Sequence, residues 1–223
     1  MIKAVIFDLD GTLYEPRFFP LRLILADPGN ILKLAAERRC RRQLQGRCFG
    51  SGDEYYDELF LLMGKGNEER AQRCREWFWR RYLPNQVRII REDFYKRPQL
   101  KDLMLRLRRD GYRTAVLSDY ALAAEKLAAC GLGGILFNGV WESPELGGLK
   151  PCPQVFTKAC SLLGVRPEET LMIGDRVKTD GGATEAGLQF IHLIEKEKDR
   201  GKHGPLCKDM LWSEILEYFK VLA

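Results

Sequence analysis

The fold is decided by the stretch Ala4-Val-Ile-Phe-Asp-Leu-Asp-Gly-Thr12 near the start of the chain. Its first four residues are apolar, and two carboxylates and a glycine follow almost at once. A short apolar run bounded by turn-forming residues is typical of a parallel strand buried on both faces. Three later runs have the same character and also lead into polar or glycine-rich turns: Thr114–Leu117, Leu171–Ile173 and Phe190–Leu193.

Helical periodicity fills the segments between the later runs, at Gln99–Arg109, Ala121–Cys130 and Gln154–Gly164. Strands that alternate with helices predict a parallel sheet wound with right-handed crossovers. We therefore expect an α/β fold with a doubly wound parallel sheet, formed by residues 1–15 and 98–223.

Residues 16–97 interrupt this alternation, because they contain helical patterns and no convincing strand. The insertion follows the first strand, so it should lie over the carboxyl edge of the sheet, where open α/β folds bind ligands. We expect a small all-helical cap that acts as a lid. Its predicted helices are Leu21–Gln45 with a break near Pro28, Asp53–Met63 and Glu68–Tyr82, with Trp77, Phe78 and Trp79 in the cap core.

The composition is that of a folded globular protein, with 223 residues, 45% hydrophobic and 30% charged. The N-terminal segment matches neither a signal peptide nor a membrane span, so we expect a cytoplasmic protein without a membrane partner. Seven cysteines without any CxxC pair predict reduced thiols, and argue against both a disulfide framework and a zinc site. His192 and His203 are too few and too far apart in sequence to suggest a metal site.

The formal charge of +5 is concentrated in the first half of the chain. Residues 14–97 carry 18 Lys and Arg against 12 Asp and Glu, including Arg38, Arg39, Arg41 and Arg42. Such a face could bind nucleic acid or another polyanion. A solvated helical face is the more common reason for this pattern, so nucleic acid is the less favoured interpretation.

Two carboxylates, Asp8 and Asp10, stand at the end of the first predicted strand. On a strand their side chains point the same way, and the turn at Gly11 lets both converge on a hard cation such as Mg²⁺. An ordinary strand end followed by an Asp-Gly turn is the alternative.

Three further elements carry possible phosphate or metal chemistry after later strands. Ser118 offers a hydroxyl to a phosphate or a helix cap, and Asp119 follows it. Lys150 stands before a proline in a glycine-rich segment and can neutralise phosphate charge, although most lysines only lie on the surface. Asp175 could bind a cation with Asp180 as its supporting partner, or the two could belong to a turn and a capped helix.

Together these elements resemble the haloacid dehalogenase superfamily, whose pattern runs DxDGT, S/T, K-P and GDxxxxD. The matching residues occur in that order across the chain: Asp8-Leu9-Asp10-Gly11-Thr12, Ser118, Lys150-Pro151 and Gly174-Asp175 with Asp180. The resemblance implies a Rossmann-like core with a cap inserted after the first strand, and Mg²⁺ as the cofactor.

The resemblance also implies a role for each residue. Asp8 would be the nucleophile and a metal ligand, while Asp10 would be the general acid and base and a metal ligand through its backbone carbonyl. Thr12, Ser118 and the adjoining Asp119 would form the phosphate-binding segments. Lys150 would hold Asp8 and the phosphate, Asp175 would complete the metal site, and Asp180 would orient Lys150.

Asp10 favours phosphate transfer over dehalogenation, because a halide leaves without needing a proton. We therefore expect a magnesium-dependent phosphohydrolase that cleaves a small phosphorylated metabolite through an aspartyl-phosphate. The alternatives are a phosphomutase of the same family and a polyanion-binding protein, and the oligomeric state stays open. Two departures from the family pattern are Cys152 in place of a common Asp, and Asp119 in place of a common Asn.

Overall fold

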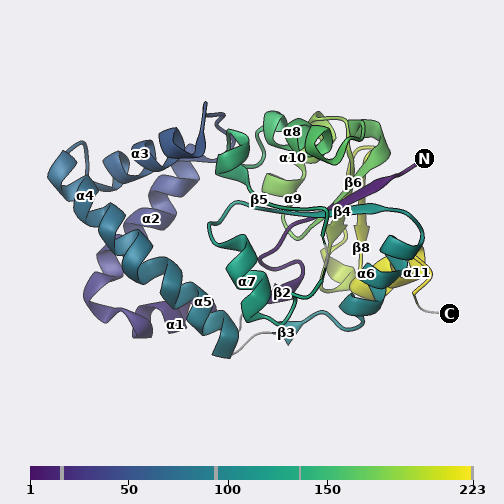
Figure 1. Cartoon of the computed structure of the whole chain (residues 1–223), viewed down its shortest axis with the longest axis horizontal. Coiled ribbons are helices and arrows are strands. Elements are labelled where there is room, and N and C mark those ends of the chain that lie inside the picture. The colour runs from purple at the N-terminus through teal and green to yellow at the C-terminus, as the bar shows by residue number, and fades with distance from the viewer. Residues whose placement is uncertain (16–17, 93–94, 136, 222–223) are drawn as a thin grey trace.

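The computed structural model describes residues 1–15, 18–92, 95–135 and 137–221. These residues form an α/β body and a helical body, which lie side by side in Figure 1. The α/β body contains a six-stranded sheet in which all neighbouring strands are parallel. The strand order is β5-β4-β1-β6-β7-β8, with bounds β1 Ala4–Phe7, β4 Arg113–Ser118, β5 Gly139–Glu142, β6 Thr170–Gly174, β7 Gln189–Leu193 and β8 Cys207–Met210.

Strand β1 lies in the middle of the sheet, with β4 on one side and β6 on the other. The winding direction of the chain therefore reverses at β1. At such a reversal the connecting segments leave the sheet in opposite directions and open a crevice at the carboxyl ends of the strands. The Asp8 to Thr12 segment begins at this point.

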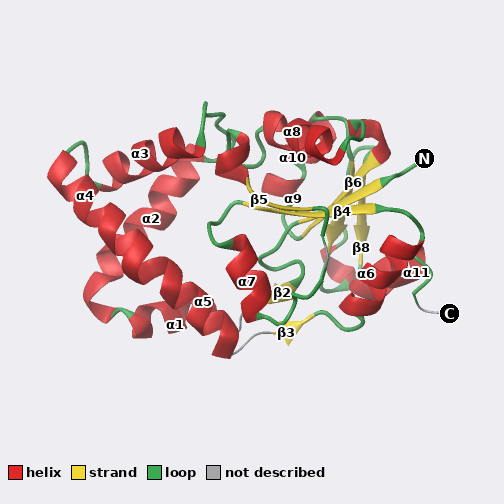
Figure 2. Ribbon diagram, in the orientation of Figure 1, coloured by secondary structure: helices red, strands yellow, loops and turns green. Residues whose placement is uncertain are grey.

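Both faces of the sheet are covered by helices (Figure 2). Successive residues of β1 point to opposite faces, so Val5 and Phe7 belong to one apolar cluster and Ala4 and Ile6 to another. The first cluster includes residues of α6 Leu100–Arg109, α7 Ala123–Ala129 and α11 Trp212–Tyr218, and the second includes residues of α8 Pro153–Leu163 and α10 Gly182–Glu185. The expected doubly wound α/β fold is confirmed.

The four strands predicted from apolar runs are present as β1, β4, β6 and β7. Strands β5 and β8 were not predicted. All residues of β5 are only half-buried, and β8 is an outer strand with an exposed Lys208, so neither shows the apolar run of a central strand.

The helical body comprises the segments between Phe19 and Glu92. The break near Pro28 is confirmed, because a short 3₁₀ turn separates the first two helices. The elements are α1 Phe19–Ala26, η1 Pro28–Asn30, α2 Ile31–Leu44, α3 Gly52–Met63, α4 Glu68–Trp77, the π-helical turn η2 Phe78–Tyr82 and α5 Leu83–Glu92.

Aromatic side chains form much of the core of the helical body. Trp77 and Phe78 are buried there, and the ring of Phe78 lies 5.3 Å from that of Phe60 between centroids. Trp79 is 40% exposed, so its predicted place in the cap core is wrong. It packs over Tyr56 at the surface instead.

Helix α5 continues the predicted Glu68–Tyr82 helix by ten residues. The π-helical turn η2 comes directly before Leu83 and Pro84. Proline lacks a backbone donor and crowds the preceding turn, and widening that turn accommodates it without ending the helix. Pro84 therefore explains why the sequence predicted that the helix ends at Tyr82.

Two short strands connect the bodies. β2 Tyr14–Glu15 and β3 Tyr95–Lys96 pair in antiparallel fashion where the chain leaves and returns to the core. Neither was predicted, and β3 lies within residues 16–97, where the sequence indicated no strand; each has only two residues, too few to show a strand pattern. Arg97 is buried beside them and donates to the carbonyls of Gly11 and Thr12. The cap boundary at residue 16 lies outside the described residues, and the division at 15 and 98 stays a prediction.

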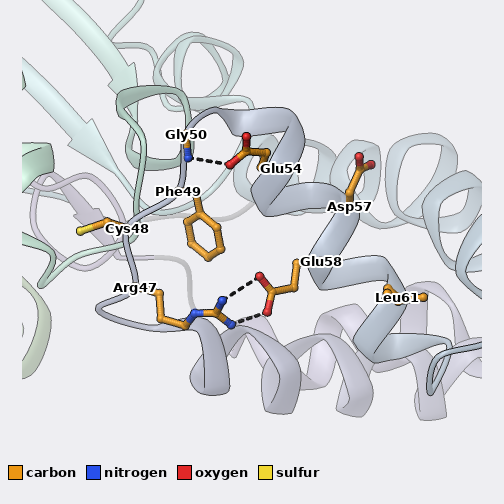
Figure 3. A pocket seen from close by; sticks show the side chains of 8 residues that line it. All are labelled: Arg47, Cys48, Phe49, Gly50, Glu54, Asp57, Glu58 and Leu61. Atoms are coloured by element: carbon orange, nitrogen blue, oxygen red, sulfur yellow. Dashed lines mark hydrogen bonds and ion pairs between the residues drawn. The ribbon is translucent and has the colours of Figure 1, made fainter.

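A disulfide joins Cys48 and Cys152, with 5.9 Å between their Cα atoms. The expectation that every cysteine is reduced is therefore wrong for this pair. The two are 104 positions apart, and backbone hydrogen bonds from Phe49 to Gly147 and from Leu149 to Arg47 bring their segments together. Figure 3 shows the cap side of this junction, where Arg47 and Glu58 form an ion pair beside Cys48.

None of the helices in the described ranges is long and apolar enough to cross a membrane. The cytoplasmic location stays a prediction.

Candidate active site

Asp8 follows β1 directly and is almost fully buried. Its backbone N–H donates to the carbonyl of Ile173, which extends the ladder between β1 and β6 and fixes the residue in place. One carboxylate oxygen accepts from Thr12 Oγ1 at 3.0 Å, and the other accepts from Lys150 Nζ at 2.7 Å. Both oxygens thus stand at the crevice with defined partners.

Lys150 is the buried cation of the site, with a side chain that is 1% exposed. Its Nζ donates to Asp8, to Asp180 at 2.6 Å and to the carbonyl of Leu117 at 3.2 Å, which uses all three ammonium protons. Burial lowers the pKa of Lys150, but the carboxylates of Asp180, Asp8 and Asp119 outweigh it and raise that pKa well above its usual value. The site therefore favours the charged ammonium form of Lys150.

Asp8, Asp175 and Asp180 bring carboxylate oxygens within 4.8 Å of one another. Burial, and next the charge of Asp8, raise the pKa of Asp175 to about 6. One oxygen of Asp175, Oδ1, is buried and has no hydrogen-bond partner in the described part of the chain. A carboxylate cluster with an unpartnered oxygen fits a hard divalent cation such as Mg²⁺, which prefers oxygen ligands and would offset the repulsion.

Glycine at position 11 keeps the space beside Asp175 open. A Cβ at Gly11 would lie 2.5 Å from Asp175 Oδ2, and the backbone there has a φ of +100°, which L side chains rarely adopt. The Gly in the Asp8 to Thr12 motif is thus needed for both the turn and the close approach of Asp175.

The side chain of Asp10 has different partners from Asp8. It accepts hydrogen bonds from Tyr14 Oη and, at 3.3 Å, from Ser118 Oγ. Lys126 Nζ lies 3.4 Å from both carboxylate oxygens. Asp10 is thus held by three donors. It does not belong to the group of three carboxylates found among the described residues.

Tyr14 and Lys126 were not identified from the sequence. Lys126 lies on the buried face of α7, three residues after the buried Ala123 and next to the buried Leu127. A lysine on the apolar face of a helix was the available signal, because such a residue needs a buried partner.

Ser118 is the last residue of β4 and Asp119 follows it, and both lie at the same crevice. Ser118 Oγ donates to Asp10 and accepts from the backbone N–H of Tyr120. Asp119 accepts from the backbone N–H of Lys150 at 3.0 Å, so its side chain is directed to that segment. The structure brings together all the predicted site residues, namely Asp8, Asp10, Thr12, Ser118, Asp119, Lys150, Asp175 and Asp180. Their individual roles stay predictions.

A larger cavity of about 490 Å³ lies between this crevice and the cap. Its core side includes Asp10 and Asp175, and its cap side includes Arg38 and Arg42 of α2. This volume is in the range of small-molecule sites.

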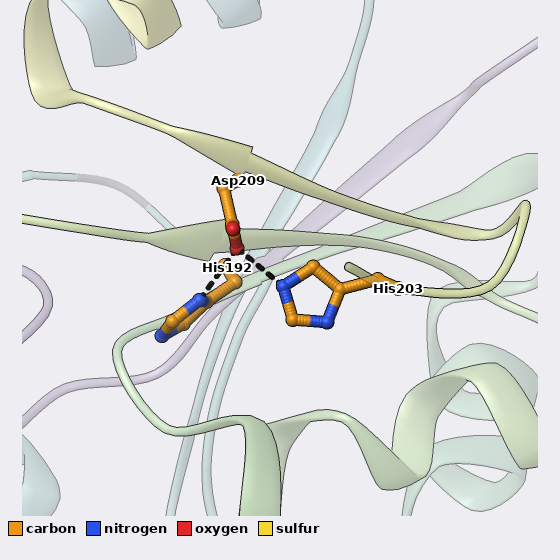
Figure 4. Close-up of side chains that lie close together, drawn as sticks. All are labelled: His192, His203 and Asp209. Atoms are coloured by element: carbon orange, nitrogen blue, oxygen red, sulfur yellow. Dashed lines mark hydrogen bonds and ion pairs between the residues drawn. The ribbon is translucent and has the colours of Figure 1, made fainter. Parts of the chain in front are cut away.

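His192 and His203 meet at Asp209 (Figure 4). Each places a ring nitrogen 2.7 Å from Asp209 Oδ1, and the metal-binding atoms of the three residues lie within 4.8 Å of one another. The expectation that the histidines are too far apart to form such a group is therefore wrong, because β7 and β8 pair His192 with Asp209. The other ring nitrogen of His192 lies 3.2 Å from the carbonyl of Asp175, so this group also supports the active-site loop.

The fold and this site define a haloacid dehalogenase-like hydrolase, whose family model matches residues 2–187, and the chain belongs to that family. It is 31% identical over 206 residues to the glyceraldehyde 3-phosphate phosphatase of Methanopyrus kandleri, covering 86% of this chain and 84% of the relative. It is 28% identical over 220 residues to the human N-acylneuraminate-9-phosphatase, covering 87% and 83%. The chain is therefore a phosphatase of this family.

Solved structures share the fold. A HAD phosphatase from Thermococcus onnurineus aligns with a TM-score of 0.61 and 22% identity, covering 97% of both chains. A β-phosphoglucomutase from Clostridium difficile aligns with a TM-score of 0.65 and 20% identity, covering 99% of this chain and 98% of the other. At these identities the likeness is one of fold.

Proposed function

We propose that this phosphatase is magnesium-dependent and cleaves a phosphate monoester of a small metabolite through an aspartyl-phosphate at Asp8. The observation that carries the proposal is that Asp8 and Asp10, only two positions apart in sequence, have different surroundings. Asp8 belongs to the carboxylate cluster and is bonded to Lys150, whereas Asp10 is bonded to Tyr14, Ser118 and Lys126. Two carboxylates in unlike environments suit unlike roles.

In the first step an oxygen of Asp8 attacks the phosphorus atom, and the bond to the ester oxygen breaks. Asp10 gives its proton to the departing oxygen, which leaves as an alcohol. Asp10 then takes a proton from water, which attacks the phosphorus of the aspartyl-phosphate. The bond between the phosphorus and the Asp8 oxygen breaks in this step, so the Asp8 carboxylate is restored and free phosphate is released.

The charge of the phosphoryl group has to be offset during both steps, and the side chains of Asp8 and Asp175 with the backbone carbonyl of Asp10 would hold Mg²⁺ for this purpose. Lys150 adds a fixed positive charge next to Asp8. Thr12 and Ser118 carry hydroxyls at the same edge, and each would turn from its carboxylate to the phosphoryl oxygens.

A phosphomutase would use the same first step and then pass the phosphoryl group to a second substrate hydroxyl. A polyanion-binding role for the basic cap is the other alternative, and it predicts affinity that falls steeply between about 50 and 200 mM salt. Release of free phosphate distinguishes hydrolysis from both.

The test is phosphate release from p-nitrophenyl phosphate, measured with added Mg²⁺ and with EDTA. Wild type should release phosphate only with the metal, and Asp8→Asn should lower the rate by at least about 10⁴-fold. Asp102→Asn, on the core helix α6, is the matched control because it makes the same chemical change away from the site. Equal rates for wild type and Asp8→Asn would contradict the proposal.

A further inference from the structure

The cap side of the 490 Å³ cavity carries two arginines, Arg38 and Arg42, that are one helical turn apart on α2. Within the described ranges, no carboxylate lies within ion-pair distance of either guanidinium. Like charges four residues apart on a helix destabilise it. An anion held between the two would remove that repulsion.

The neighbouring Arg41, on the same helix, is an arginine whose charge and side chain are both partnered within the protein. It forms an ion pair with the buried Glu37, and its guanidinium stacks 3.7 Å from the ring centroid of Tyr120. Its charge is thus neutralised inside the protein. Arg42 Nε donates to the backbone carbonyl of Arg38 at 3.4 Å, but neither arginine has a carboxylate or aromatic partner among the described residues. Both are exposed and line the cavity, which separates them from an arginine that only packs.

Gln86 of α5 supplies a second, independent observation. Its side chain lines the same cavity and is 1% exposed, and its buried amide nitrogen Nε2 has no hydrogen-bond partner among the residues that the structure describes. A buried amide without a partner is costly, so its presence points to a ligand that accepts a hydrogen bond.

The opposite side of the cavity contains Asp10 and Asp175, where the phosphate ester would react under the function proposed above. We propose that the substrate is a phosphate monoester with a second anionic group, distant from the ester. Arg38 and Arg42 bind this second anion, and Gln86 donates a hydrogen bond to the same part of the molecule. The proposal rests on the phosphatase function, and it names the substrate class as phosphorylated acids or bisphosphates.

Carboxylate and phosphate both accept bidentate hydrogen bonds from arginine, so the chemistry of the cavity is shared by the two. Paired substrates separate them. 3-Phosphoglycerate and glycerol 3-phosphate differ in a carboxylate against a hydroxymethyl group. Fructose 1,6-bisphosphate and fructose 6-phosphate differ in a second phosphate.

The experiment compares kcat/KM within each pair for wild type and for Arg38→Gln/Arg42→Gln. Wild type should prefer the doubly anionic member of at least one pair, and the double variant should lose roughly 10-fold to 100-fold of that preference. Arg39→Gln/Arg80→Gln is the matched control, because it removes the same charge from the cap at exposed positions that do not line this cavity. The control should keep the preference.

Equilibrium binding makes the test independent of turnover. Calorimetry with the Asp8→Asn protein, with and without the two cavity substitutions, should show the same preference and the same loss. The pair that shows the preference identifies the second anion as a carboxylate or a phosphate. No preference in either pair, or the same preference in the cavity variant, overturns the inference. Preferential binding without any phosphate release by wild type would instead contradict the phosphatase mechanism and leave the anion site standing.

Discussion

The disulfide between Cys48 and Cys152 offers a prediction that can be worked out from its position in the chain. It joins the segment before α3 in the cap to the segment before α8 in the core, across 104 positions. Closing a loop of about 100 residues restricts the unfolded chain by about 4.7 kcal/mol in the chain-entropy treatment, and native disulfides typically deliver about 2 to 4 kcal/mol. We therefore expect Cys48→Ala/Cys152→Ala to lower the free energy of unfolding by about 2 to 4 kcal/mol.

The assay is urea unfolding of wild type and the double variant, each with and without a phosphine reductant. Reductant should destabilise wild type and leave the double variant unchanged. Thiol titration of the unfolded, unreduced protein should find five free thiols of the seven cysteines. Cys207→Ala, which removes a free thiol, is the control and should not change the response to reductant. Seven free thiols, or no effect of reductant on wild type, would refute the reasoning.

Three further predictions concern the cap core, an acid-sensitive contact and the partner of Asp10. Phe78→Ala should destabilise the protein by about 3 to 5 kcal/mol in urea unfolding, because a buried aromatic is removed, while the 40% exposed Trp79→Ala should cost less. Burial raises the pKa of Asp27, but its hydrogen bonds, above all from Asn30, outweigh it and hold the pKa below its usual value. Because this pKa is lower in the folded than in the unfolded protein, where it is about 4, the ionised Asp27 stabilises the fold at higher pH, and this stabilisation is lost on acidification. The free energy of unfolding of wild type should therefore fall more between pH 5 and 2 than that of Asp27→Asn. Equal losses would contradict this. Lys126→Met should lower kcat about 10-fold to 100-fold in phosphate-release assays, because it removes a donor 3.4 Å from Asp10. An unchanged kcat would show that Lys126 does not assist Asp10 in the reaction.

The central strands could be predicted because each is buried on both faces, which leaves a continuous apolar run in the sequence. The run Ala4–Phe7 shows no exposed position at all. The outer strand β8 pairs with only one strand, β7, and contains polar residues. Its sequence, Cys-Lys-Asp-Met, therefore carries no such signal. Helix α5 was hidden for a different reason, because a π-helical turn accommodates Pro84.

The candidate site could be predicted as far as its residues follow strand ends. Asp8, Ser118 and Asp175 come from three neighbouring strands, and parallel strands end at one edge. Contacts that depend on side chains from unrelated segments could not be found in this way. Lys126 reaches Asp10 over 116 positions, and the Cys48–Cys152 disulfide depends on how the cap sits on the core.

The most direct test of the central claim is chemical trapping of the phosphorylated residue. Wild type is mixed with substrate and Mg²⁺, quenched in acid and reduced with borohydride, which converts an aspartyl-phosphate to homoserine. Peptide mass spectrometry should find homoserine at position 8 and at no other aspartate, and none in a sample without substrate. Homoserine at another aspartate, or full phosphate release by wild type with no conversion at Asp8 under any quench time, would contradict the account.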